Sequence, residues 1–157
     1  MVLPVQVTAG LQGDPDAELA FALRGRAPKM HWVLPERIEA AVQRSPGLGA
    51  RATGLPVGVF LQAEVERVGD PLYGQLRRLA ALVDAEVALL PVRVAPGPMH
   101  VTGRATVQVF AALVAVRSGR VLWFGVVEGT PGPPGGPGPL ASAMERLART
   151  LLWYEAR

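Results

Sequence analysis

The chain has 157 residues, a length typical of one domain, and half of them are hydrophobic while 18% are charged. That balance excludes an intrinsically disordered chain. Cysteine is absent, which excludes disulfides, thiolate catalysis and the usual zinc sites. The net charge of +3 is small, and the arginines that produce it do not cluster along the sequence, so we expect no nucleic-acid partner.

The first residues already predict a strand, and the basic region and long apolar stretch of a secretion signal do not precede it in this sequence. We therefore expect either a cytoplasmic protein or a sequence that starts after a removed signal, which would make the protein periplasmic or membrane-peripheral. The longest uninterrupted apolar run, 109–116, is far shorter than the roughly 20 residues that cross a bilayer. The sequence predicts no transmembrane segment.

Two strand-then-helix pairs are predicted in the first 44 residues. Val2–Thr8 alternates apolar residues and predicts a strand, after which Asp14 and Pro15 supply an N-cap and a first-turn proline for a short helix. Met30–Leu34 predicts a second strand, which Pro35 ends. The helix that begins there runs to Arg44, with apolar side chains on one side.

The middle of the chain predicts a loop and then a clear helix. Ser45–Pro56 is rich in glycine and proline, while Val57–Val68 is ambiguous and favours a short helix. Asp70 and Pro71 repeat the cap-and-proline start. The helix that follows has a buried stripe at spacings of four, three and four, formed by Leu72, Leu76, Leu79 and Val83.

Three strands are predicted next, at Glu86–Val94, Arg104–Val116 and Arg120–Gly129. The second and third form an antiparallel hairpin, closed by a tight turn in which Gly119 supplies positive φ. Because the second strand is apolar on both faces, we expect it inside the sheet, covered on both sides. Its side chains expected to be buried are Phe110, Leu113 and Val116.

The segment Pro131–Pro139 contains only proline and glycine, and predicts an extended loop that enters neither a helix nor a central strand. An amphipathic helix from Leu140 to Leu152 follows it. The sequence thus predicts the α/β class: one domain, 1–157, with a single mixed sheet of about five strands and helices packed against it, in the order β-α-β-α-(α)-α-β-β-β-α.

Three stretches resemble a family of bacterial envelope domains: Val2–Val5, Leu79–Leu89 and Ser118–Trp123. The family comprises the curli-secretion lipoprotein, the penicillin-binding-protein activator lipoproteins and the N-terminal domain of the Tol-system propeller protein. The resemblance implies a mixed sheet with packed helices and a role in assembly or recognition at the envelope, without catalytic residues. The chain departs from the family in lacking a lipobox cysteine, so lipid anchoring is not implied.

The residues that could carry catalysis are few. His31 lies in a predicted apolar strand, where a packed residue is more common than a ligand, and His100 lies in a predicted loop without a second ligand nearby. The serines Ser45, Ser118 and Ser142 lie in no nucleophile motif. Two carboxylate pairs, Glu36 with Glu39 and Glu64 with Glu66, are interpreted as solvated helix faces, as are Arg77, Arg78, Arg146 and Arg149. We expect no enzyme, metal or cofactor.

The glycines of 132–138 form no phosphate cradle, because the interspersed prolines remove the amide donors that such a loop supplies. The sequence therefore favours a non-catalytic, membrane-extrinsic interaction or scaffolding subunit that stabilises an envelope or membrane-bound assembly, such as a secretion, cell-wall or photosynthetic complex. Its expected partners are other protein subunits, with contact to a membrane surface also considered. The alternatives are a small carboxylate-dependent hydrolase or nucleotide-binding enzyme, and an RNA-binding domain.

The partner surface is predicted at the C-terminal end of the chain. Prolines lower the entropy that a segment loses when it is immobilised, and aromatic residues are enriched at interfaces. The residues expected to contact the partner are Pro133, Pro134, Pro137, Trp153, Tyr154 and Arg157.

Overall fold

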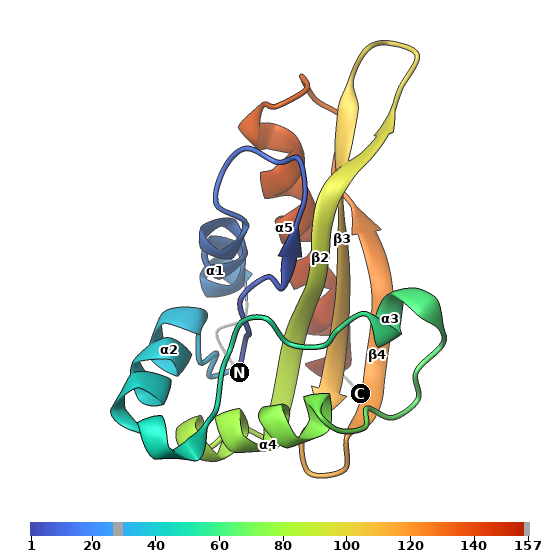
Figure 1. Ribbon diagram of the computed structural model, residues 1–157. Coiled ribbons are helices and arrows are strands. Elements are labelled where there is room, and N and C mark those ends of the chain that lie inside the picture. The colour runs from blue at the N-terminus through green and yellow to red at the C-terminus, as the bar shows by residue number, and fades with distance from the viewer. Residues whose placement is uncertain (27–29, 156–157) are drawn as a thin grey trace. The chain divides into compact units, whose positions relative to one another are not determined.

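A computed structural model describes residues 1–26 and 30–155, and places them in an α/β fold with one four-stranded mixed sheet of order β1-β2-β3-β4 (Figure 1). β1 pairs with β2 in parallel, and the strands that follow alternate in direction. The predicted fold class is confirmed. The strands are β1 Val7–Thr8, β2 Val87–Met99, β3 Ala105–Ala115 and β4 Arg120–Glu128; the helices are α1 Pro15–Arg26, α2 Pro35–Arg44, α3 Val59–Gln62, α4 Leu72–Val83 and α5 Pro137–Glu155, with a 3-10 turn, η1, at Pro46–Leu48.

The chain divides into two compact units. Unit 1 contains residues 1–6, 32–92 and 111–125, and unit 2 contains 7–31, 93–110 and 126–157. Strands β2, β3 and β4 each contribute residues to both units. That the whole chain is one domain stays a prediction.

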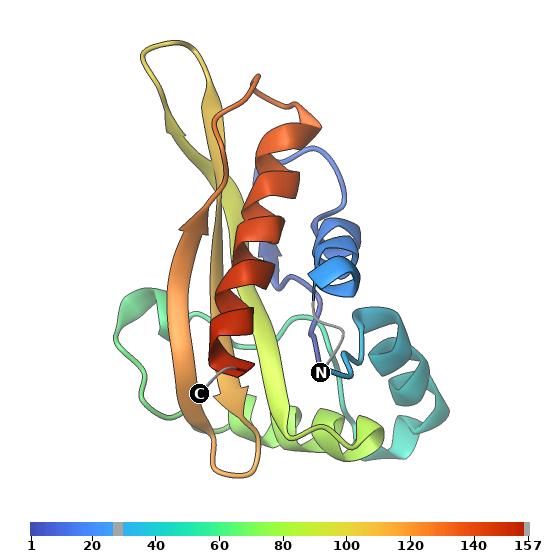
Figure 2. The same cartoon turned by 180° about the vertical axis from the view of Figure 1, so that it is seen from behind.

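In unit 2, α1 and α5 pack together beside the strands, as Figure 2 shows. The apolar stripe of α5 is buried, as its spacing predicts. Leu140, Met144 and Leu147 are all almost fully buried, and Leu19 and Leu23 of α1 are equally so. The Asp14 carboxylate caps α1 as predicted, because its Oδ1 accepts hydrogen bonds from the backbone N–H groups of residues 16 and 17 at 3.0 and 3.1 Å.

The predicted hairpin of β3 and β4 is confirmed, and β3 is an interior strand. Gly119 has φ of 70° in the connecting turn, and Leu113 and Val116 are buried. Phe110 is only half-buried, contrary to the prediction. In unit 2, Val107 and Val109 are buried while Gln108 and Phe110 are half-buried, so at positions 107–110 one face of β3 is covered more completely than the other.

The strand predicted over Val2–Thr8 is interrupted. Val2 makes an isolated parallel bridge with Leu89, and regular pairing resumes only at Val7 and Thr8. Pro4 lies between these two paired stretches and has no N–H to donate to a ladder.

The second predicted strand, Met30–Leu34, is wrong. The structure has no strand there; the backbone N–H of Val2 donates to the carbonyl of Val33 at 2.8 Å, and α2 begins immediately at Pro35. A single hydrogen bond does not make a ladder, and Pro35 cannot extend one. The helix Pro35–Arg44 has its predicted bounds.

Between α2 and β2, the helix at Leu72–Val83 is confirmed and the one in Val57–Val68 is shorter than predicted. Only Val59–Gln62 is helical, and the rest of that segment is extended or bent. Asp70 does not occupy the N-cap position, which is Pro71, but its Oδ1 accepts a hydrogen bond from the Gly74 N–H at 2.9 Å.

The proline-glycine segment also differs from its prediction. Gly132 forms a bridge with Ala105, and each residue donates its N–H to the other's carbonyl at 2.9 Å. α5 starts at Pro137, so the end of the segment is helical. A helix accepts proline in its first turn because the N–H groups there have no intrahelical partner.

Candidate interaction surfaces

Both histidines are exposed. His31 was expected to be packed, but the segment that carries it is not a strand and its side chain faces water. His100 lies in the turn between β2 and β3, because β2 extends to Met99 through residues predicted as a loop. Among residues 1–26 and 30–155, no group of three or more His, Asp or Glu side chains could hold a metal ion.

The candidate acid–base and nucleophile residues lie in ordinary structural settings. Glu36 and Glu39 are exposed on α2, as predicted; Glu64 and Glu66 are exposed too, but in the bent segment after α3 and not on a helix. Ser142 has a structural role at the start of α5, where its Oγ accepts from the Thr130 N–H at 2.7 Å and donates to the Pro139 carbonyl at 3.0 Å.

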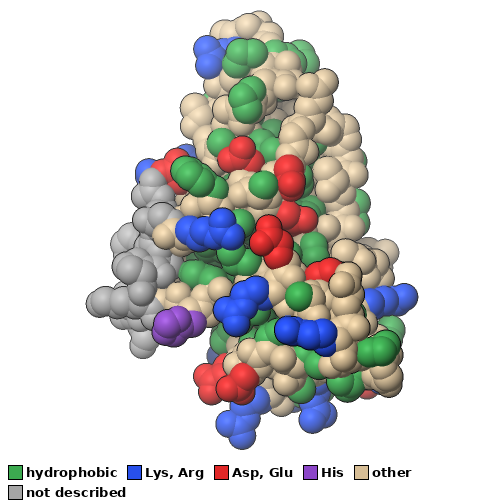
Figure 3. Space-filling view, turned by 90° about the vertical axis from the view of Figure 1, so that its left-hand side faces the viewer, with side chains coloured by type: hydrophobic (Ala, Val, Ile, Leu, Met, Phe, Trp, Pro, Cys, Tyr) green, Lys and Arg blue, Asp and Glu red, His purple; other side chains and the backbone are tan. Residues whose placement is uncertain are grey.

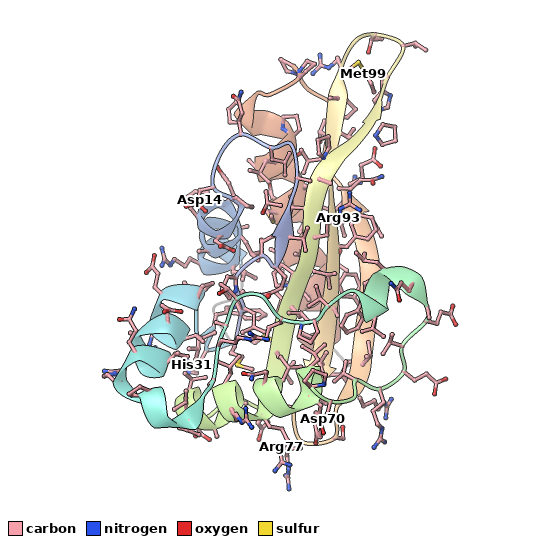
Figure 4. All side chains as sticks on the ribbon, viewed as in Figure 1. Asp14, His31, Asp70, Arg77, Arg93 and Met99 are labelled. Atoms are coloured by element: carbon pink, nitrogen blue, oxygen red, sulfur yellow. The ribbon has the colours of Figure 1, made fainter. Side chains whose placement is uncertain are left out.

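The arginines predicted on helix faces are exposed. Arg77 points away from α4 and lies over the ring of Tyr73, 5.8 Å from its centroid (Figure 4). Arg149 forms an ion pair with Glu145 at 2.9 Å, and Arg146 donates to the Glu128 carbonyl at 2.8 Å.

The residues predicted to contact a partner are exposed where the structure describes them, at Pro133, Pro134 and Pro137. The backbones of Trp153 and Tyr154 belong to α5, but their side chains and all of Arg157 lie outside the described residues. Their role in partner binding stays a prediction.

Three segments of unit 2 meet around a small cavity: the loop 9–13, the end of the β2–β3 hairpin at 96–105, and the loop 129–136. We call them together the loop tip. All three contribute to the lining of the cavity, whose volume is about 190 Å³. The Arg104 guanidinium joins two of them, because its Nη2 and Nε donate to the Pro131 carbonyl at 2.8 and 3.2 Å. The Ala105–Gly132 bridge joins the same two segments through the backbone.

The hairpin of the loop tip ends in an ordered turn that exposes apolar side chains. The Gly103 N–H donates to the His100 carbonyl at 2.9 Å, and the His100 N–H donates to the Arg104 carbonyl at 2.8 Å. Gly103 has φ of 72°, which suits a glycine after a tight turn. At this end, labelled by Met99 in Figure 4, Met99 is 67% exposed and Val101 is fully exposed.

The loop tip carries no carboxylate, since its three segments contain neither aspartate nor glutamate. Its charged and titratable side chains are those of Arg104 and His100. At the top of the view in Figure 3, hydrophobic and basic side chains are visible. The nearest glutamate along the chain, Glu128, has a pKa lowered from its ordinary value, mainly by the hydrogen bond from Gln108 Nε2 at 3.1 Å.

Unit 1 carries a second apolar surface, the α3 patch, formed by Val59, Phe60, Leu61 and Phe124. Phe60 is buried and stacks on Phe124 of β4, with 5.5 Å between ring centroids and 23° between ring planes. Val59 and Leu61 flank it and are 43% and 42% exposed, and Phe124 is 36% exposed. The stack fixes α3 against β4 while its two neighbours project into water.

The sequence singled out Pro133 and Pro134 of the loop tip, but neither the exposed turn at 99–101 nor the α3 patch. The turn at 100–103 and the short α3 helix depend on tertiary contacts, and nothing in the local pattern distinguishes an exposed valine from a buried one. The absence of carboxylates between Glu86 and Glu128 was the one available signal.

The chain was compared with protein-family models, curated proteins and solved structures. No protein-family model and no curated protein matches the chain. The crystal structure of lipoprotein GNA1162 from Neisseria meningitidis aligns over 99% of this chain and 94% of that one, at 16% identity and a TM-score of 0.46. This score is too low to establish a common fold. No helix within the described part of the chain is long and apolar enough to cross a membrane.

Proposed function

We propose that the protein is a non-catalytic, membrane-extrinsic subunit that binds another protein subunit of an envelope or membrane-bound assembly through the α3 patch. The observation that carries the proposal is the grouping of Val59, Leu61 and Phe124, three partly exposed apolar side chains next to the buried ring of Phe60. Exposed apolar side chains grouped around an aromatic residue are typical of protein interfaces, where aromatic residues at the centre contribute most of the affinity.

The envelope setting comes from the sequence resemblance carried by Val2–Val5, Leu79–Leu89 and Ser118–Trp123. A binding role is favoured over a carboxylate-dependent hydrolase, because the two glutamate pairs lie on exposed surfaces. Acid–base catalysis by paired carboxylates relies on environments that drive their pKa values apart, usually through burial.

The proposal is tested by co-purification from the source organism with a tagged parent protein and a variant carrying Val59→Ser and Leu61→Ser. The variant should lose the partner subunit while its thermal melt stays close to that of the parent, since both side chains are already partly in water. Leu48→Ser is the matched control, because Leu48 is 46% exposed in η1 of the same unit. Retention of every co-purifying subunit by the double variant would contradict the proposal.

A further inference from the structure

The turn at the end of the β2–β3 hairpin has a composition that folding does not explain. Val101 is the second residue of the His100–Gly103 turn, a position that usually holds polar residues or proline. Its side chain is fully exposed, so it contributes no packing to the chain, and Met99 beside it is 67% exposed. An apolar pair at this position therefore favours a contact outside the chain.

We propose that the loop tip binds the surface of a lipid membrane that contains anionic headgroups, with Met99 and Val101 entering the interfacial layer. A tight turn presents its side chains on a convex surface, which buries little area against a folded protein. A lipid surface deforms around a convex protein segment, so this binding requires no complementary pocket. The ordered backbone of the turn means that little conformational entropy is lost on contact.

The charge of the loop tip favours a lipid surface with negative headgroups. Its segments contain no carboxylate that such a surface would repel. Arg104 uses two of its five N–H donors on the Pro131 carbonyl, which fixes the guanidinium near the turn and leaves three donors for phosphate oxygens. A basic residue beside an anionic membrane strengthens binding by about fivefold.

The first test uses sedimentation with vesicles of phosphatidylcholine alone, and of phosphatidylcholine and phosphatidylglycerol in equal parts. The parent should bind the mixed vesicles more tightly. Met99→Ser with Val101→Ser should weaken binding by on the order of tenfold, because two exposed apolar side chains are lost. Arg104→Gln should weaken binding by about fivefold, and only to the anionic vesicles. Phe21→Ser is the control, since Phe21 on α1 of the same unit is 78% exposed.

The second test uses a fluorescent dye and does not depend on those variants. The chain has no cysteine, so Val101→Cys carries a single environment-sensitive dye at a position without packing contacts. Its emission should shift to the blue with the mixed vesicles, whereas the same dye at Phe21→Cys should not respond. Equal vesicle binding by the parent and the Met99/Val101 variant, or equal loss with Phe21→Ser, would overturn the proposal.

A dye at position 101 that responds to purified membrane proteins but not to vesicles would also overturn it, and would assign the loop tip to a protein partner. Vesicle binding is independent of the α3 patch. The Val59/Leu61 variant should therefore bind vesicles like the parent, so a failure here is separable from a failure of the proposed function.

Discussion

Replacing Gly129 by alanine should disrupt the junction between β4 and α5. The Gly129 N–H donates to the Val107 carbonyl at 2.9 Å, which fixes the backbone at this point. A Cβ built there would lie 2.2 Å from the Pro139 carbonyl oxygen, 2.6 Å from the Ser142 Oγ and 2.9 Å from the Ala143 nitrogen. Two of these three atoms belong to the backbone and cannot turn aside, so the start of α5 must move.

The magnitude follows from the cost of overpacking a buried site, about 1 to 3 kcal/mol. Because the contacts at Gly129 are with backbone, we expect a loss of about 2 to 3 kcal/mol in the free energy of unfolding, measured by urea denaturation. Gly138→Ala is the matched control, since a Cβ at Gly138 in the first turn of α5 meets nothing within 4 Å. That variant should be neutral or slightly stabilised. A Gly129→Ala protein as stable as the Gly138→Ala protein would refute the reasoning.

Three further predictions concern stability. Leu113→Ala should lower the free energy of unfolding by about 2 to 5 kcal/mol in urea denaturation, because Leu113 is 4% exposed in an interior strand. A loss below about 1 kcal/mol would contradict this packing. Asp14→Ala should cost about 0.5 to 2 kcal/mol by the same assay, because two N–H groups of α1 lose their acceptor, whereas Asp14→Asn should retain most of the stability. Burial lowers the pKa of the Met1 amine from 8.0 to about 6 in the folded chain. Between these values the unfolded chain binds the extra proton, so the free energy of unfolding falls as the pH is lowered, by about 2 kcal/mol from pH 8 to 6. Acetylation of the amine should remove this pH dependence, and an unchanged dependence would contradict it.

The parts of the fold that the sequence predicts well are those in which one local pattern decides the outcome. Leu72, Leu76 and Leu79 of α4 and residues 111–114 of β3 are buried, as their apolar patterns predict. Asp14 followed by Pro15 marks the start of α1. The turn at Gly119 likewise follows from one residue with positive φ.

The errors concern residues whose structure depends on distant partners. Met30–Leu34 is apolar enough for a strand, but it has one backbone bond to Val2 and no ladder. Pro137 was predicted to lie in a loop, but it is the first residue of α5. Proline is accepted there because the N–H groups of the first helical turn have no intrahelical partner. Gly132 pairs with Ala105 across 27 positions, and no local pattern indicates that contact.

Dependence on distant contacts also explains why the predicted partner residues differ from most residues of the loop tip and the α3 patch. Pro133, Pro134 and Pro137 are exposed. Pro133 and Pro134 belong to the loop tip and line its cavity. Met99 and Val101 lie between the predicted strands Glu86–Val94 and Arg104–Val116, and the local sequence does not show whether an apolar residue in such a connection packs or faces water. Only the turn geometry shows that their side chains face water.

The most direct test of the proposed function is site-specific photo-crosslinking in living cells of the source organism, with the photoreactive residue at position 61 of the α3 patch. The proposed function predicts one discrete adduct with a subunit of the membrane fraction, and no such adduct when the same residue replaces Leu48. The absence of an adduct at position 61, or equal adducts at both positions, would contradict the claim that this protein acts by binding a partner through the α3 patch.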